Sequence, residues 1–500
     1  MKKIVLLLAL CLSCNLASAQ FPIDFSRVGY MWGEKPIPDH HVSITLSAPS
    51  DGADMTSVIQ EALDKVKSSG TVLLKEGQYN VSGTLYMRRS GVVLRGEGNG
   101  TVITATSYKR DPLIVLGKDT RRVTGERNRI VDDFTPAGQM WVRVDKPSKF
   151  SVGDRVDVVC EVNQKWVSDL KMDQIAQRRD GRKLKQWTPQ EFVLRWERHV
   201  VKVKDGKIWL DNPIVMELDS QYMASAYLEH VTWDRVSQCG IENMKLVSRY
   251  DPSVKLTMTS GKHEGLVYDG DEKHCWKAIE VRAAEHCWIR NIESAHFAFG
   301  LVSVVDGGKN ITVRDCIVRD PVSRIFGGRR YAFHISSGQL CLFERCSAGH
   351  DRHGFATSSR ASGPNVFVDC SMTNAFADMG PHLKWASGLL YDCCTTDGWI
   401  AVQDRAGHGN GHGWTAVSCV LWNCEAGTIT CQSPWINGKN WCIGCIARKT
   451  SGRRYDDALK RPDGVWESHG EHVAPMSLYR QQFEDRKELI TKKIRQGKHF

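Results

Sequence analysis

The chain has 500 residues, of which 67 are Lys or Arg and 57 are Asp or Glu, giving a formal net charge of +10. This mild basic excess suits a polyanionic partner and suits plain solubility equally well, and we expect no nucleic-acid partner. After the first 20 residues, no apolar run reaches the roughly 18 residues that a membrane-spanning helix needs.

Residues 1–19 have the pattern of a secretory signal peptide. Two lysines precede an apolar run, and the small residues 17–19 end it. We therefore expect a secreted or periplasmic protein after cleavage of this segment. Cys14 leaves a surface lipoprotein open as an alternative, although Cys11 three residues earlier matches that signal poorly.

The segment 52–98 combines a helix with short strands. An amphipathic pattern over 58–66 predicts a helix, and GTVLLKEGQYNVSGTL then reads as strands broken by glycines. Residues 140–235 differ, because VGDRVDVV and DGKIWLDNPI indicate antiparallel strands around a polar, basic loop at 165–198. We interpret 140–235 as a β-rich insertion, either one wall of a groove or a solvated surface segment.

A short phrase recurs from residue 239 onward. It reads CGIENM at 239, CWIRNI at 287, ITVRDC at 311, CLFERC at 341, NVFVDC at 365, GLLYDC at 388, CVLWNC at 419 and NWCIGC at 440. Its third position is apolar, its fifth is mostly Asn or Asp, and short strands of this kind predict a solenoid of parallel strands. The long first interval, from 239 to 287, suggests two turns of the solenoid, with an intermediate phrase that is too irregular to recognise.

Cysteine fills the sixth position of six successive phrases. Stacked about one strand spacing apart, these side chains would form a ladder inside the solenoid, because free cysteine packs as a small hydrophobe. No CxxC pair with zinc spacing accompanies them, so we interpret them as reduced core rather than a metal site. The six are Cys316, Cys346, Cys370, Cys393, Cys424 and Cys445.

These patterns predict an all-β fold, a right-handed parallel β-helix with an N-terminal capping helix. The stretch 52–98 resembles the opening segment of the pectate-lyase-like superfamily, in which a helix caps the first coil. We expect a C-terminal helix at 475–494 to cover the open edge of the last coil. The expected parts are the signal peptide at 1–19, cap and first coils at 20–139, insertion at 140–235, further coils at 236–450 and a tail at 451–500.

Residues at one offset in successive coils stack on one face of a solenoid. Three histidines precede successive phrases by six or seven residues, the last in the glycine-rich loop RAGHGNGHGW at 405–414. We expect this loop to present its imidazoles to solvent at the rim of a saccharide groove, with His408 outside the column. The predicted catalytic residues are His382, His412, Tyr331, His334 and Arg405. The predicted substrate-binding residues are Lys384, Trp385, Arg352, His353, Trp414 and His350.

The superfamily resemblance implies a carbohydrate-active enzyme, either a polysaccharide lyase or a family 28-like glycosidase. GPHLKW, GHGW, VLWNC and SLYRQQFEDR, spread over 381–485, also resemble a group of bacterial secreted β-helix proteins labelled lyase-like. The stretch 324–414 is rich in Arg, Lys, His and Tyr. Side chains of these types can catalyse β-elimination of an acidic polysaccharide or oligosaccharide without a metal.

We therefore predict a uronate-cleaving polysaccharide lyase. No cofactor is assigned, and calcium is left open. One alternative is an inverting glycoside hydrolase whose paired carboxylates would come from Asp320, Asp351, Asp397 or Asp404. The other is a glycan-binding solenoid without catalysis.

Overall fold

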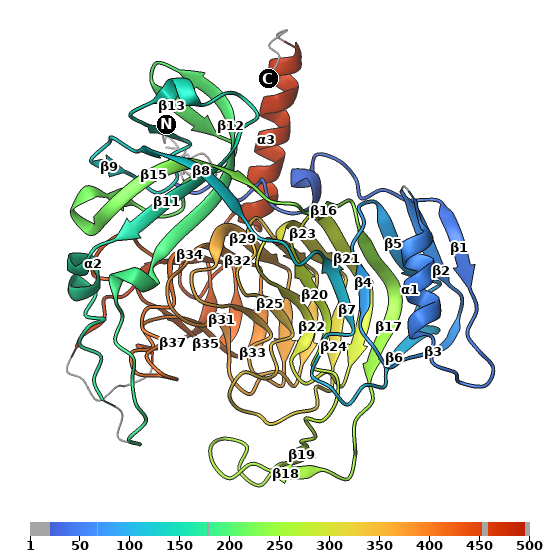
Figure 1. Ribbon diagram of the computed structural model, residues 1–500. Coiled ribbons are helices and arrows are strands. Elements are labelled where there is room, and N and C mark those ends of the chain that lie inside the picture. Colours follow the sequence, from blue (N-terminus) through green and yellow to red (C-terminus); the bar gives the residue numbers. More distant parts are fainter. Residues whose placement is uncertain (1–20, 68, 178–179, 453–458, 496–500) are drawn as a thin grey trace, which may run out of the picture.

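The computed structural model describes residues 21–67, 69–177, 180–452 and 459–495. Its main body is one solenoid of short parallel strands, which runs from the blue coils to the orange coils in Figure 1. The predicted signal peptide lies outside the described residues. Within them, no helix is both long enough and apolar enough to cross a membrane.

Three parallel ladders form the walls of the solenoid, which is a right-handed parallel β-helix as predicted. The first ladder holds β1 (Val42–Leu46), β2 (Gly70–Leu74), β5 (Val92–Gly96), β16 (Val236–Ser237), β17 (Gly240–Ser248), β21 (Ala284–Ala295), β23 (Lys309–Arg314), β26 (Leu342–Glu344), β29 (Ser362–Val368), β32 (Ala386–Asp392), β34 (Ala416–Trp422), β36 (Trp441–Ile443) and β38 (Val465–Glu467). The second holds β3 (Gly77–Val81), β6 (Thr101–Ala105), β24 (Ile317–Arg319), β27 (Ser347–Gly349), β30 (Ser371–Thr373), β33 (Thr395–Val402), β35 (Glu425–Cys431) and β37 (Ile446–Lys449). The third holds β4 (Leu85–Met87), β7 (Ile114–Gly117), β20 (Lys277–Arg282), β22 (Gly300–Val304), β25 (Phe333–Ile335), β28 (Phe355–Thr357) and β31 (Asp378–Pro381).

The repeated phrase crosses a turn between the first and second ladders. Its fifth residue takes the left-handed backbone conformation, φ +59° at Asn243 and +54° at Asp315, which Asn and Asp tolerate better than most residues. In the coil of β32 the left-handed residue is Cys393, at φ +52°. The repeated phrase in this coil therefore begins at residue 389 and not at residue 388, the position that the sequence pattern suggests.

The cysteine ladder is confirmed as free thiols, with one substitution. Cys393 is half-buried in the turn, and the fully buried Cys394 takes the interior place. Each interior thiol donates to a backbone carbonyl of the preceding coil, as Cys370 does to Phe343 O at 3.5 Å. The thiols therefore fill core space and satisfy their weak donors.

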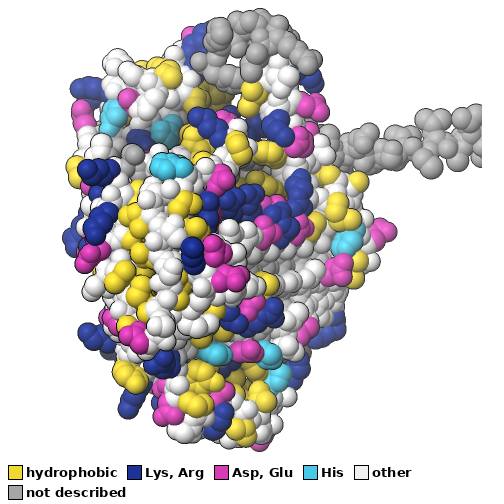
Figure 2. All heavy atoms as spheres, turned by 90° about the vertical axis from the view of Figure 1, so that its right-hand side faces the viewer, with side chains coloured by type: hydrophobic (Ala, Val, Ile, Leu, Met, Phe, Trp, Pro, Cys, Tyr) yellow, Lys and Arg dark blue, Asp and Glu magenta, His cyan; other side chains and the backbone are white. Residues whose placement is uncertain are grey.

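One expectation about the coils needs correction. β17 pairs directly with β21, so the first interval is one coil, lengthened by the hairpin of β18 (Lys255–Thr257) and β19 (Val267–Asp269). At the N-terminal end, α1 (Thr56–Lys65) packs on β4 and confirms the predicted cap. Figure 2 faces this end of the molecule, where acidic and basic side chains are interspersed among hydrophobic ones.

The insertion is an antiparallel sheet beside the C-terminal half of the solenoid (Figure 1). Its edge strand β8 starts before the predicted boundary at 140. Buried ion pairs join the insertion to the solenoid. Glu197 accepts hydrogen bonds from Arg235 at 2.9 and 2.6 Å and from Lys309 at 3.0 Å. The sheet holds β10 (Trp141–Arg143), β13 (Lys207–Leu210), β12 (Val193–Lys204), β11 (Arg155–Val162), β15 (Met223–Thr232) and β8 (Val123–Arg129), with β9 (Phe134–Thr135), β14 (Leu218–Asp219) and α2 (Gln164–Asp169) beside it.

The C-terminal helix α3 (Leu478–Arg495) is present but does not cover the last coil. It starts against β32, where Asp392 accepts from the backbone N–H of Tyr479 at 2.8 Å. It then packs on the N-terminal segment, where Gln482 accepts from Phe25 N at 2.8 Å. Its apolar and polar partners therefore lie at the side of the solenoid.

Candidate functional site

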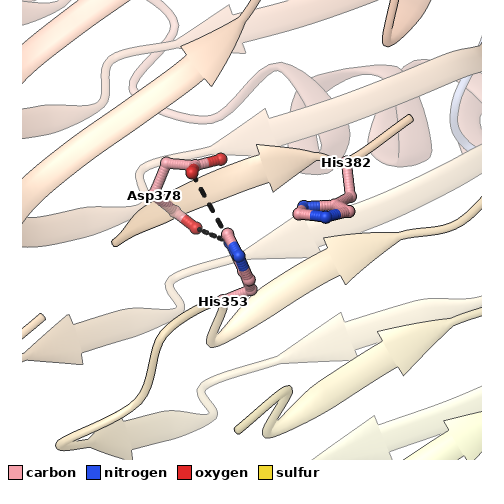
Figure 3. A group of neighbouring side chains, drawn as sticks. All are labelled: His353, Asp378 and His382. Carbon is pink, nitrogen blue, oxygen red and sulfur yellow. Dashed lines mark hydrogen bonds and ion pairs between the residues drawn. The ribbon is translucent and has the colours of Figure 1, made fainter. Parts of the chain in front are cut away.

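A cluster of polar side chains lies on the outer face of the third ladder. Asp378 begins β31 and His382 directly follows the strand, and ligand atoms of both lie within 4.8 Å of one another and of His353. Tyr331 precedes β25 and His353 precedes β28 on the two preceding coils. Figure 3 shows His353 against Asp378, with His382 beside them.

His382 is held at both ring nitrogens. Its Nδ1 lies 3.1 Å from Arg405 Nη1, and its Nε2 lies 3.2 Å from Tyr331 Oη. A guanidinium can only donate, so Nδ1 accepts and, in the neutral ring, Nε2–H donates to the tyrosine oxygen. The phenol proton of Tyr331 is thereby directed away from His382.

His353 is oriented by Asp378. Its Nδ1 donates to the backbone carbonyl of Asp378 at 2.9 Å and lies 3.5 Å from the carboxylate Oδ1. In the neutral ring the lone pair is therefore on Nε2. Arg405 binds the other carboxylate oxygen, so one ion pair fixes Asp378, His353 and His382 together.

Burial sets the protonation of this cluster. Desolvation raises the pKa of Tyr331, so the phenol keeps its proton at neutral pH. Desolvation, and then the nearby His353 and Arg405, hold the pKa of His382 well below its usual value, so its ring is neutral. The cluster thus contains a protonated phenol and a neutral imidazole within 3.2 Å of each other.

The three residues of Figure 3 have the donor types of a metal site, with ligand atoms within 4.8 Å of one another. The arrangement does not fit a cation, because Arg405 already binds both Asp378 and His382 Nδ1. Calcium in particular needs six to eight oxygen ligands, and this group has one carboxylate. The catalytic steps proposed below therefore use side chains alone.

The glycine-rich loop is packed rather than exposed. His412 is half-buried with its ring centroid 5.0 Å from that of His382, and His408 lies 5.7 Å from His412. Gly411 has φ +102°, and a Cβ there would lie 2.3 Å from Lys185 O of the insertion. The glycines therefore allow close approach of the insertion, and the two imidazoles, which were expected to point to solvent, are half-buried.

The two predicted sugar-stacking indoles are core residues. Trp385 and Trp414 are both 0% exposed and pack between the solenoid and the insertion. Both indoles lie on the outer face of the solenoid, and the insertion covers that face. Lys384 is also taken up by the insertion, since its Nζ lies 2.6 Å from Glu191 Oε2.

The remaining predicted residues have different surroundings. His334 is buried and its Nε2 is 2.8 Å from Ser358 Oγ, and burial lowers its pKa to about 3. Arg352 is half-buried and bonds the carbonyl of Arg329 at 3.2 Å, beside Tyr331. His350 is an exposed left-handed turn residue at φ +58°, 3.5 Å from Asp320, so it lies outside the cluster.

Asp378 is the member that sequence reasoning missed. Its only signal is its spacing, four residues before His382. Asp351, one of the carboxylates of the hydrolase alternative, is fully buried, and neither of its carboxylate oxygens has a hydrogen-bond partner among the described residues.

The carboxylates of the hydrolase alternative have separate surroundings. Asp320 is exposed beside His350, and Asp397 accepts from the backbone N–H groups of Asn374 and Ala375. Asp404 is buried and accepts from Arg461 Nε at 2.9 Å.

No family model and no curated sequence matches the chain. Similar solved structures include the tailspike protein gp49 from Pseudomonas phage LKA1 (11% identity, 78% of this chain and 56% of that chain, TM-score 0.48). They also include an alginate lyase from Paenibacillus (9%, 86% and 100%, 0.38) and a polygalacturonase from Erwinia carotovora (11%, 88% and 98%, 0.39). The chain spans 56% and 61% of the lengths of the LKA1 and phi297 tailspike proteins. These likenesses concern the β-helix fold, and no residue receives a role from them.

Proposed function

We propose that the protein is a carbohydrate-active enzyme, a polysaccharide lyase that cleaves an acidic glycan by β-elimination. The supporting observation is the bonded chain Tyr331–His382–Arg405–Asp378–His353 on the outer face of one ladder. It joins an acid, a base and the groups that orient each of them. Such an arrangement serves a reaction that removes one proton and donates another.

Tyr331 is the proposed general acid. Elimination breaks the bond between C4 and the glycosidic oxygen, and that oxygen must take up a proton. The phenol is protonated at neutral pH because burial raises its pKa, and His382 Nε2–H already donates to its oxygen. The same N–H then stabilises the phenolate that forms. His382 and Arg405 are positioning residues in this scheme.

His353 is the proposed general base. It removes the proton at C5 of the uronate, and the electron pair forms the C4–C5 double bond as the leaving oxygen departs. Its Nε2 carries the lone pair because Nδ1–H is bound to Asp378. The carboxylate 3.5 Å from Nδ1 then stabilises the imidazolium that forms.

Exposure increases from the reacting groups toward the loop. His353 is 2% exposed, Tyr331 6% and His382 8%, while His412 is half-buried. We expect the saccharide to enter from the His412 side and Arg352, beside Tyr331, to bind its carboxylate. His412, whose ring centroid lies 5.0 Å from that of His382, lines this side of the cluster.

The test is a screen of the purified protein against pectate, alginate, ulvan and glycosaminoglycans. The proposal expects ultraviolet absorbance from an unsaturated uronate on at least one of them. New reducing ends without that absorbance would replace the lyase with a hydrolase. Binding without any cleavage would leave a glycan-binding solenoid.

A further inference from the structure

The outer part of the insertion carries two tryptophans side by side on one face of its sheet. Trp141 of β10 is directly paired with Trp209 of β13, and their ring centroids are 6.2 Å apart. Both rings are half-buried. Figure 1 places β13, which pairs with the C-terminal part of β12, at the outer end of the insertion, away from β31 and β33 of the solenoid.

Basic side chains surround these rings. Lys207 Nζ lies 3.8 Å from the Trp141 ring centroid, Lys202 Nζ lies 5.6 Å from that of Trp209, and Arg143 lies 5.0 Å from that of Trp141. We call these five residues the tryptophan face. Lys202 and Arg143 are exposed, and Lys207 is half-buried.

The charge of the tryptophan face is mostly uncompensated. Arg143 pairs with Asp132 at 2.8 Å, whereas Lys202 and Lys207 form no ion pair among the described residues. Its other side is core, since Val142 and Ile208 between the tryptophans and their neighbours are 0% exposed. The sheet is therefore anchored from below and leaves its indoles and ammonium groups to the solvent side.

We infer that the tryptophan face is a second saccharide-binding surface, which takes a carboxylated glycan chain outside the catalytic site. Indole rings stack on the apolar C–H faces of pyranose rings, and the two lysines supply charge complementary to uronate carboxylates. Neutral glycans lack the second contribution, and nucleic acids would need a longer basic track. The choice of acidic glycan rests on the proposed function, while the binding surface itself does not.

The experiment is affinity electrophoresis of the full chain in gels that contain pectate, a neutral galactan or single-stranded DNA. The variants are W141A with W209A, and K202A with K207A. The matched control is W233A, because Trp233 is also half-buried under two arginines, but Arg235 is bound to Glu197 and Arg122 to Asp157. Circular dichroism confirms folding.

Retardation of the wild type by pectate should fall at least about tenfold in apparent affinity in the double tryptophan variant, and W233A should match wild type. The double lysine variant should lose most of the salt-sensitive part of the binding. Equal retardation by galactan or DNA, or unchanged retardation in both double variants, would overturn the inference. Because this readout requires no cleavage, it stays decisive even if the chain forms no elimination product.

Discussion

At the scale of single residues, the solenoid core combines aliphatic side chains with thiols at one repeated position. Cys346, Cys370 and Cys394 are each 0% exposed, and each donates to a carbonyl of the coil before it. A thiol tolerates this long bond, whereas a hydroxyl in the same place has a shorter reach and a larger desolvation cost.

We therefore expect Cys370→Ser to lower the free energy of unfolding by about 1–3 kcal/mol. Urea denaturation measures this loss. Cys393→Ser is the matched control, since Cys393 is half-buried in the adjacent turn, and its effect should stay within about 0.5 kcal/mol. A disulfide at Cys370 in the native protein, or equal effects of both variants, would disprove the reduced ladder.

Asp351 makes stability depend on pH. Its carboxyl is fully buried, with no hydrogen-bond partner in the part of the chain that the structure describes, and burial raises its pKa from 3.8 to about 7. The folded state thus holds a proton that the unfolded state releases near pH 3.8, so stability is lost as pH rises toward about 7.

Asp351→Asn removes that loss. The difference in Tm between the variant and wild type should be several degrees larger, in favour of the variant, at about pH 8 than at about pH 5. Differential scanning calorimetry at the two pH values gives the comparison. Asp205→Asn, with a carboxylate that is 78% exposed and has Lys204 as its partner, should show the same difference at both. A flat response for Asp351→Asn would mean that its carboxyl ionises freely when folded.

At the scale of elements, the loop 404–414 is shaped by the insertion that it contacts. Lys185 N donates to Asn410 O at 3.0 Å, and Trp187 Nε1 donates to Gly411 O at 3.1 Å. Gly411→Ala should be destabilising by about 1–3 kcal/mol, because φ is +102° and the new Cβ meets Lys185 O.

Limited proteolysis of the loop and thermal unfolding would show the effect of Gly411→Ala. Asn410→Ala is the control, since Asn410 is exposed and contributes its backbone carbonyl to this contact. If the two variants behaved alike, the close approach of the insertion would not govern the loop.

Sequence periodicity predicted the elements well because each coil repeats the same physical demand. The left-handed turn at Asn243 and the interior place of Cys370 recur in successive coils from residue 239 onward, so they are visible without contacts. Contacts between distant segments left no such signal. Nothing local indicates that Trp385 would be covered by the insertion, or that Arg405 would bind Asp378 instead of a substrate.

At the scale of the whole molecule, the solenoid and the insertion form one unit. Their shared core includes Trp166, Trp385 and Trp414, and the buried Glu197 ties them with Arg235 and Lys309. The polar cluster of Tyr331, His353 and His382 lies on the solenoid, whose coils set the register of these three residues.

The most direct test of the account is the rate of unsaturated product formation by Tyr331→Phe on the best acidic glycan. The change removes one hydroxyl, keeps the ring, and takes away the proposed proton donor to the leaving oxygen. The account predicts a loss of about 10²–10⁴-fold in turnover, with an unchanged circular dichroism spectrum. A variant within about threefold of wild type, or a wild type that forms no unsaturated product from any acidic glycan, would contradict it.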